Sequence, residues 1–272
     1  MTTRQLVRRY LAQQQRTAHE TAPPVAARFQ LIINCSSKML YLLPTPLAEG
    51  TAPQVLPPQV VAAVARLPYF LVENLRTARR FVKEVAPHRV IEDIRFELID
   101  KDSTPAQVKA ALEPLVKHGL EAGVLSEAGC PGIADPGAAL AQEAHRLGLP
   151  VRPLVGPSSI LLALMGSGLN GQRFAFHGYL PIEKGPRIAA IKQLEKESTQ
   201  RDQSQLFIET PYRNDQLLAD LLAQLAPGTR LCVAADLTAP TEYLRTLPVA
   251  TWRRLPELPK LHKRPTVFAF GQ

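Results

Sequence analysis

The segment SEAGCPGIADPG, residues 126–137, holds three glycines and two prolines and directly follows the apolar run AGVL. Two other loops with glycine or proline, PTPLAEG at 44–50 and VGPSS at 155–159, also follow apolar runs. Glycine lets a backbone approach a ligand closely, and proline fixes a loop without donating a hydrogen bond. Together the three loops predict a binding site for a flat ligand with polar edges. The alternative is that each loop is only a turn between a strand and a helix.

The loops do not match two common phosphate-binding patterns. The chain has no G-x-x-x-x-G-K-[ST] sequence, and no G-x-G-x-x-G sequence opens a helix after the first expected strand. These patterns bind nucleoside triphosphates and dinucleotides through backbone amides at a helix start. The sequence therefore indicates a ligand of another kind.

Alternating strands and helices position these loops in the first half of the chain. The expected strands are residues 39–43, 69–73, 95–99, 123–126 and 151–155, and the expected helices are 59–66, 75–86, 105–118 and 137–147. Thr104 and Asp135 precede prolines and are suited to cap helices, and Gly148 is suited to end one. The alternation predicts an α/β domain with a doubly wound sheet, and ligands of such sheets bind at the carboxyl ends of the strands.

The second half has fewer expected helices. Its expected strands are residues 173–178, 205–209, 230–236 and 266–270, and its expected helices are 186–197 and 213–225. Residues 241–254 lack a helical period and are suited to strands. We therefore expect an N-terminal α/β domain at 39–156 and a C-terminal α+β domain at 157–272, with a cleft where they join. Residues 1–38 are interpreted as an N-terminal extension that is disordered or results from a wrongly assigned start. A targeting segment and a basic RNA-contacting arm are the alternatives.

Composition limits the class of protein. The longest apolar runs, such as ILLALM at 160–165, are far shorter than the roughly 20 residues that cross a bilayer, so no membrane segment is expected. Cys35, Cys130 and Cys232 are widely spaced and odd in number, which favours a reducing cytoplasm over a disulfide framework and indicates no metal site. Five of the eight net positive charges lie in residues 1–38, and the remaining three suit an ordinary enzyme.

Seven segments occur in the order of a known family. They are LYLLPTP, SEAGCPGIADPG, PLVGPSSILLALMGSGL, FHGYLP, LFIETPYR, VAADLT and KRPTVFAF. In this order they resemble the tetrapyrrole methylase superfamily of S-adenosylmethionine-dependent methyltransferases. More narrowly, the chain is similar to the bacterial 16S ribosomal RNA (cytidine-2′-O)-methyltransferase I family, from Met39 to the C-terminus.

The resemblance implies two α/β domains, with S-adenosyl-L-methionine bound between them, and a homodimer. By position in the family's motifs, the residues implied to bind the cofactor are Pro46, Gly129, Cys130, Pro131, Ile133, Ser158, Ser159, Glu209 and Thr266. Glu73 and Arg76 match a second motif of the family. Asp135 is expected to cap the next helix rather than to contact substrate.

The chemistry of methyl transfer adds candidate catalytic residues. The cofactor carries an activated methyl group, so the protein has to orient the acceptor and exclude water. If the acceptor is a ribose 2′-hydroxyl, a base or a charge-stabilising group is expected within about 3 Å. Glu73, Arg76 and Glu209 are the predicted catalytic residues, and the further candidates are Glu127, His177 and Arg213. Structural roles are the alternative for each, above all for His177.

The chain departs from the RNA-methylating family in its substrate loops. Ala48 and Glu49 replace Gly-Asn in the first loop, Asn74-Leu75 replaces Asp-Thr after Glu73, and Tyr212 replaces a histidine. The cofactor loops are closer to the family's pattern. We therefore predict a methyltransferase acting on small-subunit ribosomal RNA, in a divergent branch. Methylation of a tetrapyrrole carbon and a non-catalytic binding protein are the alternatives.

Overall fold

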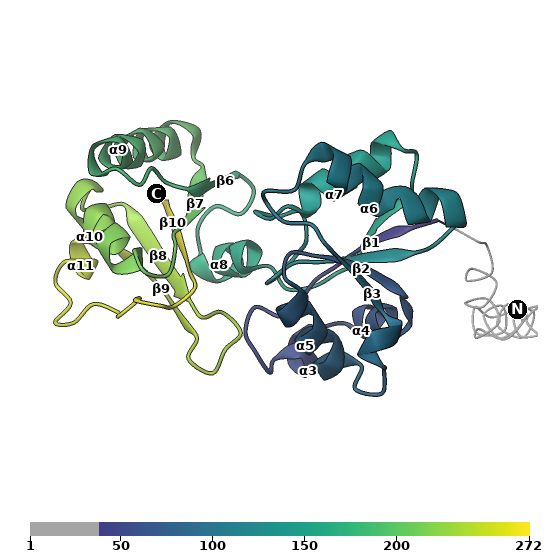
Figure 1. Ribbon diagram of the computed structural model, residues 1–272. Helices are drawn as coiled ribbons and strands as arrows, with labels where there is room; N and C mark the ends of the chain where they lie inside the picture. Colours follow the sequence, from purple (N-terminus) through teal and green to yellow (C-terminus); the bar gives the residue numbers. More distant parts are fainter. Residues whose placement is uncertain (1–37) are drawn as a thin grey trace, which may run out of the picture. The chain divides into compact units, whose positions relative to one another are not determined.

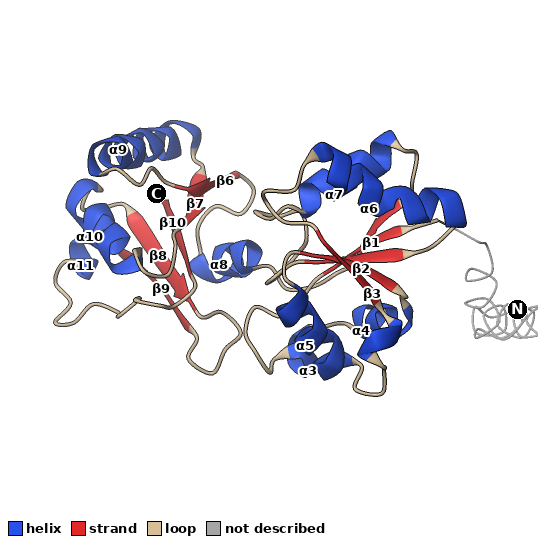
Figure 2. Cartoon of the chain, viewed as in Figure 1, coloured by secondary structure: helices blue, strands red, loops and turns tan. Residues whose placement is uncertain are grey.

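Ten strands form two five-stranded sheets in the part of the chain that the computed structural model describes, residues 38–272 (Figures 1 and 2). The first sheet lies within residues 40–153 and the second within residues 174–271. The α/β fold class predicted from the sequence is confirmed. The predicted N-terminal extension lies outside the described residues except for Lys38, and the domain boundary at residue 157 stays a prediction.

The first sheet is entirely parallel and has the strand order β3-β2-β4-β1-β5. Its strands are β1 Leu40–Leu43, β2 Tyr69–Val72, β3 Arg95–Leu98, β4 Ala122–Leu125 and β5 Val151–Pro153. Leu43 pairs with Leu125, and Leu42 pairs with Pro153. Because the strands are parallel and in this register, the loops after β1, β4 and β5 all leave from the carboxyl ends of the strands, on one side of the domain.

Helices cover both faces of the first sheet (Figure 1). On one face lie α3 Ala52–Val55, α4 Pro58–Arg66 and α5 Leu75–Val85, and on the other lie α6 Pro105–His118 and α7 Gly137–Arg146. A short 3-10 helix, Ile91–Asp93, precedes β3. Burial on two faces explains why β2 and β4 are apolar runs without alternation. Thr104 caps α6 through a capping box with Gln107, as its place before Pro105 predicts.

The second sheet is mixed and has the strand order β6-β7-β10-β8-β9. Its strands are β6 Phe174–Tyr179, β7 Ser204–Ile208, β8 Arg230–Ala235, β9 Tyr243–Pro248 and β10 Thr266–Gly271. Strand β10 is antiparallel to both β7 and β8, with Thr266 opposite Ala235 and Val267 opposite Ile208. The first residues of β10 therefore lie beside the last residues of β7 and β8.

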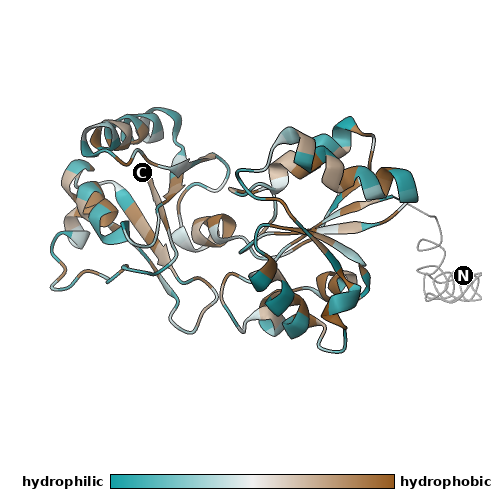
Figure 3. Ribbon diagram, viewed as in Figure 1, coloured by the Kyte–Doolittle hydropathy of each residue, from teal (hydrophilic) through white to brown (hydrophobic). Residues whose placement is uncertain are grey.

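The helices of the second half also lie on two faces of their sheet (Figure 1). Helix α8, Ser159–Ser167, packs on one face, and α9 Lys184–Arg201, α10 Asn214–Gln224 and α11 Val249–Trp252 pack on the other. Figure 3 shows hydrophobic residues along the strands and hydrophilic residues on the outer surface of α9. The buried Trp252 indole donates a hydrogen bond to the Leu231 carbonyl at 2.8 Å.

The sequence pattern missed helices α3 and α11 and the 3-10 helix Ile91–Asp93. Helix α3 lies in the proline-rich segment GTAPQVLPP, and the segment 241–254, which lacks a helical period, forms strand β9 and then the single turn of α11. Between residues 38 and 272, no helix is both long enough and apolar enough to cross a membrane.

Candidate functional site

A cavity of about 370 Å³ lies at the carboxyl ends of strands from both sheets, and we call it the main cavity. Its volume is in the range of small-molecule pockets, roughly 300–1,000 Å³. It is lined by Leu47, Glu73, Ser126, Glu127, Ala128, Gly129, Cys130, Ile133, Ala134, Asp135, Ser158, Ser159, Ile160, Tyr179, Ile208, Glu209, Pro211, Ala234, Asp236, Leu237, Pro265, Thr266 and Val267. The three loops singled out in the sequence thus contribute to one cavity.

The first loop and the glycine-rich loop are joined by two backbone hydrogen bonds. The Thr45 amide donates to the Gly129 carbonyl at 2.9 Å, and the Gly129 amide donates to the Thr45 carbonyl at 3.1 Å. Gly129 has a φ of +79°, and a Cβ atom there would lie 3.2 Å from Leu47 Cδ2 and 3.4 Å from the Pro157 carbonyl oxygen. Glycine is required at this position both by backbone conformation and by close packing.

The start of α8 forms another wall of the main cavity. Ser158 is its N-cap, and the Leu161 amide donates to Ser158 Oγ at 3.5 Å. Ser158 and Ser159 line the cavity, so the amide end of the helix borders it. Cys130 approaches the Pro157 carbonyl, with Sγ at 3.3 Å, and burial followed by Asp135 raises the pKa of its thiol. Cys130 is therefore a neutral packing residue rather than a nucleophile.

Asp135 holds the glycine-rich loop in shape. Its Oδ1 accepts hydrogen bonds from the amides of Gly132 at 2.6 Å and Gly137 at 2.8 Å. Burial raises the pKa of Asp135, and these two amides partly oppose the increase. Pro136 rather than Asp135 is the N-cap of α7, but the Asp135 side chain satisfies a free amide of its first turn. The expected capping role is therefore observed, although Asp135 also lines the cavity.

The acidic side chains that line the main cavity have no basic side chain beside them in the wall, within the described part of the chain. They are Glu73, Glu127, Asp135, Glu209 and Asp236, and no lysine, arginine or histidine lines the cavity among the described residues. Two of them have cationic partners behind the wall, since Glu209 pairs with Arg213 at 2.6 Å and Asp236 pairs with Arg264 at 2.7 Å. The wall is therefore suited to a ligand that carries positive charge.

Glu73 has the most perturbed acidity of these carboxylates. Burial, and then the neighbouring charges of Asp135, Glu127 and Asp100, raise its pKa from the ordinary 4.5 to about 6, although the Glu127 backbone favours the charged form. It forms no ion pair among residues 38–272. A carboxylate of this kind is ionised at neutral pH and is more basic than an exposed glutamate.

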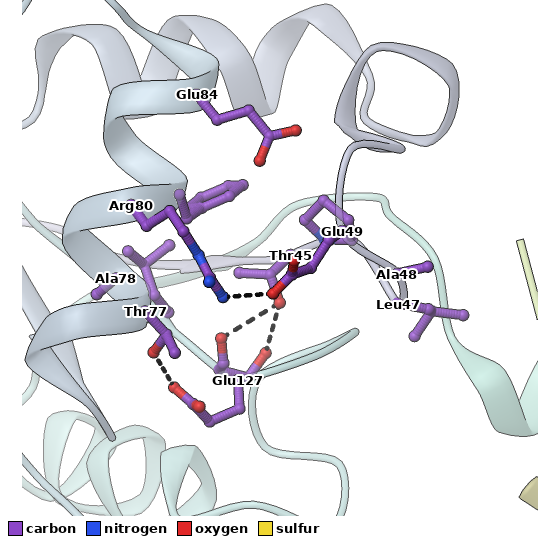
Figure 4. Close-up of a pocket in the computed structure, with 13 residues that line it drawn as sticks. Thr45, Leu47, Ala48, Glu49, Thr77, Ala78, Arg80, Glu84 and Glu127 are labelled. Atoms are coloured by element: carbon purple, nitrogen blue, oxygen red, sulfur yellow. Dashed lines mark hydrogen bonds and ion pairs between the residues drawn. The ribbon is translucent and has the colours of Figure 1, made fainter. Parts of the chain in front are cut away.

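A smaller cavity of about 190 Å³ adjoins the main cavity behind the first loop (Figure 4). Pro46 lines this smaller cavity and not the main one. Arg80 of α5 points to Glu49 of the first loop, with Nη2 and Oε1 2.7 Å apart, and Thr77 donates a hydrogen bond to Glu127 (Figure 4). These contacts connect α5 to both the first loop and the glycine-rich loop.

The structure brings most of the predicted site residues into the main cavity. Glu73, Gly129, Cys130, Ile133, Ser158, Ser159, Glu209 and Thr266 line it, together with the candidate Glu127. Arg76 and Pro131 do not line it, and Arg76 is exposed on α5. His177 pairs with Gln205 of β7, with Nε2 and Oε1 2.6 Å apart, and is not part of the wall. Whether any of these residues acts in binding or catalysis stays a prediction.

Sequence reasoning missed Asp236, Leu237 and Tyr179 in the cavity wall. Asp236 and Leu237 directly follow β8, and Tyr179 ends β6. The available signal was their position at or just after the ends of the expected strands 173–178 and 230–236. The residues that follow β1, β4 and β5 were singled out by this rule.

The main cavity fits S-adenosylmethionine by its chemistry. This cofactor carries a sulfonium and an ammonium group, which suit unpaired carboxylates and an absence of lining cations in the described residues. Its adenosyl group needs close backbone approach and apolar contacts, and Gly129, Ile133 and Leu237 supply them. Ile133 is 53% exposed, which leaves its side chain available to a ligand. Groups of side chains that could hold a metal ion are absent from residues 38–272.

Comparisons with known proteins give a consistent picture. The family model for tetrapyrrole (corrin/porphyrin) methylases matches residues 51–252. Ribosomal RNA small subunit methyltransferase I of Vibrio cholerae is 30% identical over 219 residues, which cover 79% of this chain and 71% of that protein. The protein of the same name from Pseudomonas aeruginosa is 33% identical over 135 residues, covering 50% of this chain and 46% of that protein.

Solved structures are similar in fold at lower sequence identity. The crystal structure of the methyltransferase CobJ has a TM-score of 0.59 and 17% identity, and covers 87% of this chain and 94% of that chain. Uroporphyrin-III C-methyl transferase from Thermus thermophilus, complexed with S-adenosylhomocysteine, has a TM-score of 0.50 and 16% identity, covering 86% and 97% of the two chains.

Proposed function

The chain belongs to the family of tetrapyrrole (corrin/porphyrin) methylases. From its similarity to ribosomal RNA small subunit methyltransferase I we propose that it methylates small-subunit ribosomal RNA on a ribose hydroxyl. The resemblance stated from the sequence is confirmed. The chain is an S-adenosylmethionine-dependent methyltransferase, and its named relatives act on ribosomal RNA of the small subunit. That the methyl group goes to a ribose oxygen is our proposal.

The main cavity is the proposed binding site of the methyl donor. Gly129, Ile133, Ser158 and Leu237 would hold the adenosyl and amino acid groups, and Glu209 would offer a charge fixed by its ion pair with Arg213. When bound, S-adenosylmethionine supplies a methyl group that is already activated on a sulfonium. The remaining tasks of the protein are to orient an oxygen behind that methyl group and to remove its proton.

Glu73 is the proposed proton acceptor. It lines the main cavity from the end of β2, has no cationic partner among the described residues, and has a pKa of about 6. At neutral pH its carboxylate would accept the proton of a hydroxyl as the carbon–oxygen bond forms and the methyl–sulfur bond breaks, which leaves S-adenosylhomocysteine. The proton then passes from Glu73 to solvent.

Glu209 and Arg76 have weaker positions for a role in the chemistry. Glu209 Oε1 accepts hydrogen bonds from Arg213 and from the Thr210 amide, both at 2.6 Å, so this oxygen is already engaged. We propose that it binds the donor rather than acting as a base. Arg76 lies outside the cavity wall, and we propose that it contacts substrate phosphates, together with its exposed neighbour Arg79.

The absence of lining cations among the described residues of the main cavity is the observation that favours a ribose over a tetrapyrrole. Porphyrinoids carry several carboxylates, which proteins recognise with arginine and lysine. The three carboxylates of the wall that have no ion pair among the described residues, Glu73, Glu127 and Asp135, would repel such a ring. A ribose hydroxyl is neutral, and the phosphates on either side of it can remain outside the cavity near the basic face of α5.

We further propose that the protein works in the cytoplasm as a homodimer. A ribosomal RNA substrate supports the cytoplasmic location. Leu161 and Met165 support the homodimer, because they lie one turn apart on α8 and are 51% and 77% exposed. Exposed apolar side chains on one helix face favour burial against another chain. The mass of the protein in solution, measured by light scattering, tests this.

Transfer of a labelled methyl group tests the proposed function. Small subunits and free ribosomal RNA from a strain that lacks the gene are incubated with the protein and labelled S-adenosylmethionine, and the label is mapped by nuclease digestion and mass spectrometry. We expect one ribose-methylated nucleotide. Absence of label in both substrates, with a protein that binds the donor, would disprove the proposal. Label in a porphyrinoid would support the tetrapyrrole alternative.

A further inference from the structure

Two exposed tyrosines lie at the rim of the main cavity. Tyr179 lines the cavity and is 59% exposed, and Tyr212 is 69% exposed and directly follows Pro211, which also lines the cavity. Most large aromatic side chains of the described fold are buried, including Phe207, Phe268 and Trp252. Two exposed rings beside one cavity therefore call for a functional explanation.

Both tyrosines lie at the carboxyl ends of the neighbouring strands β6 and β7. Tyr179 pairs with Ile208 at the ends of parallel strands β6 and β7, after a register shift that begins at Phe176. Gly178, with a φ of +63°, permits this irregularity. Bulges next to functional sites redirect the following side chain. Tyr212 follows β7 by four residues, so it emerges from the same edge as Tyr179.

The ring of Tyr212 has an aromatic and basic neighbourhood. The His262 ring packs against it edge to face, with the ring centres 5.7 Å apart and the planes at 70°. The Lys263 amide donates to the Pro211 carbonyl at 2.9 Å, which fixes the segment that carries His262 against the loop that carries Tyr212. Lys263 forms no ion pair within the described part of the chain. Its charge is available to a bound anion.

Arg213 lies behind the cavity wall, where it pairs with Glu209, and directly follows Tyr212 of the rim. Its ion pair with Glu209 raises the pKa of Arg213, and the nearby Tyr179 adds to the increase. Arg213 Nε is buried and has no hydrogen-bond partner among residues 38–272. The rim therefore combines exposed rings with the ammonium group of Lys263, and an unsatisfied guanidinium nitrogen lies buried behind it.

We propose that Tyr179, Tyr212 and His262 form a stacking surface for an unpaired base of the RNA next to the methylated nucleotide, with Lys263 holding its phosphate. The inference rests on the proposed function and specifies its substrate as a single-stranded segment. Bases that are splayed out of a helix stack on aromatic side chains, whereas the bases of a duplex are not accessible to them. A charged phosphate beside a stacked base matches a lysine beside a ring.

Binding of short oligoribonucleotides tests this surface. The probe is a fluorescein-labelled, cytidine-containing oligonucleotide of about ten nucleotides, either unpaired or in a duplex, with S-adenosylhomocysteine at saturation and fixed salt. We expect the protein to prefer the unpaired form. Tyr212→Ala should weaken binding of the unpaired form about tenfold, and Tyr212→Phe should remain within about twofold of the parent, because the ring rather than the hydroxyl stacks.

Phe174→Ala is the matched control, because Phe174 is a 40% exposed ring at the opposite end of β6. It should leave RNA binding unchanged, and all variants should bind S-adenosylhomocysteine like the parent protein. Equal binding of paired and unpaired RNA, or parent-like binding by Tyr212→Ala, would overturn the stacking surface.

Methyl transfer by the parent protein and by Tyr212→Ala distinguishes a failure of this inference from a failure of the proposed function. If the parent methylates ribosomal RNA and Tyr212→Ala does so with an unchanged KM, the stacking surface is wrong and the function stands. If the parent methylates no RNA but retains a porphyrinoid whose absorbance is lost in Tyr212→Ala, the proposed function is wrong and the rings stack on a macrocycle instead.

Discussion

Replacing Glu73 with glutamine should make the protein more stable and far less active. The structure explains both effects, because the carboxylate lies among Asp135, Glu127 and Asp100 in a partly desolvated position and carries no cationic partner among the described residues. Glutamine has nearly the same shape and removes the charge. Sites that hold an unfavourable charge for function are typically stabilised by such a change.

The size of the stability gain follows from the acidity of Glu73. A pKa raised from 4.5 to about 6 corresponds to about 2 kcal/mol at 1.36 kcal/mol per pKa unit. The side chain is only half-buried, so solvent screening reduces this to about 1 kcal/mol. For a chain of this size that gain raises Tm by about 3 °C.

The pH dependence has a definite sign. The folded protein holds a proton on Glu73 at a higher pH than the unfolded chain does, so the destabilisation is complete above pH about 6 and is gone below the ordinary pKa of 4.5. We therefore expect Glu73→Gln to be more stable than the parent at pH 8 and equally stable at pH 4. Thermal unfolding followed by circular dichroism measures the difference.

The loss of activity is expected to be larger than the gain in stability. Removal of a general base costs roughly 10²- to 10⁴-fold in rate. In the parent, kcat/KM should fall tenfold per pH unit below pH about 6, and this dependence should be lost in Glu73→Gln. Affinity for S-adenosylhomocysteine, measured by calorimetry, should change only a few-fold.

Glu113→Gln is the control, because Glu113 is an exposed residue of α6 that pairs with Lys117. It should change neither rate nor stability measurably. A Glu73→Gln protein that is as active as the parent, or that is less stable at pH 8, would refute the assignment of Glu73 as an ionised base.

Other substitutions test the cavity wall and the core. Gly129→Ala should weaken binding of S-adenosylhomocysteine at least tenfold in calorimetry, because its Cβ crowds the loop, whereas Gly50→Ala, with a similar φ of +73° and no atom within 4 Å, should lower stability by about 1 kcal/mol and leave binding unchanged. Asp220→Ala should lower the free energy of unfolding, measured in urea, by about 3–5 kcal/mol, because it leaves the buried Arg187 without its partner 2.7 Å away. Adding Arg187→Met to this variant should recover much of the lost stability. His177→Gln should retain methyl transfer within about twofold, because His177 hydrogen-bonds Gln205 and does not line the cavity; a loss of kcat with normal stability would contradict this.

The strands of the first sheet could be predicted from the sequence within one or two residues. The central strands β2 and β4 are short apolar runs, and both faces of the sheet are covered by helices, so pattern and environment agree. Strand β9 could not be predicted in the same way. It lies at the edge of the second sheet, and its residues are only partly buried, so the alternation of polar and apolar residues is weak.

The location of the site could be predicted in part, because parallel strands bring their following loops to one edge. Gly129 and Ser158 were found by this rule together with the family resemblance. Thr266 begins its strand, and it reaches the site because β10 runs antiparallel to its neighbours β7 and β8. Strand order and direction in a mixed sheet depend on contacts far apart in the chain, so neither Asp236 nor Tyr179 could be assigned to the wall from local pattern alone.

The paired amides of Thr45 and Gly129 constrain how such a protein can diverge. Each amide satisfies the carbonyl of the other loop, and a buried backbone group without a partner is costly, so neither segment can be lengthened or tilted independently. An insertion in either loop would have to keep both of these hydrogen bonds, so the spacing between the two loops is set by the backbone rather than by side chains.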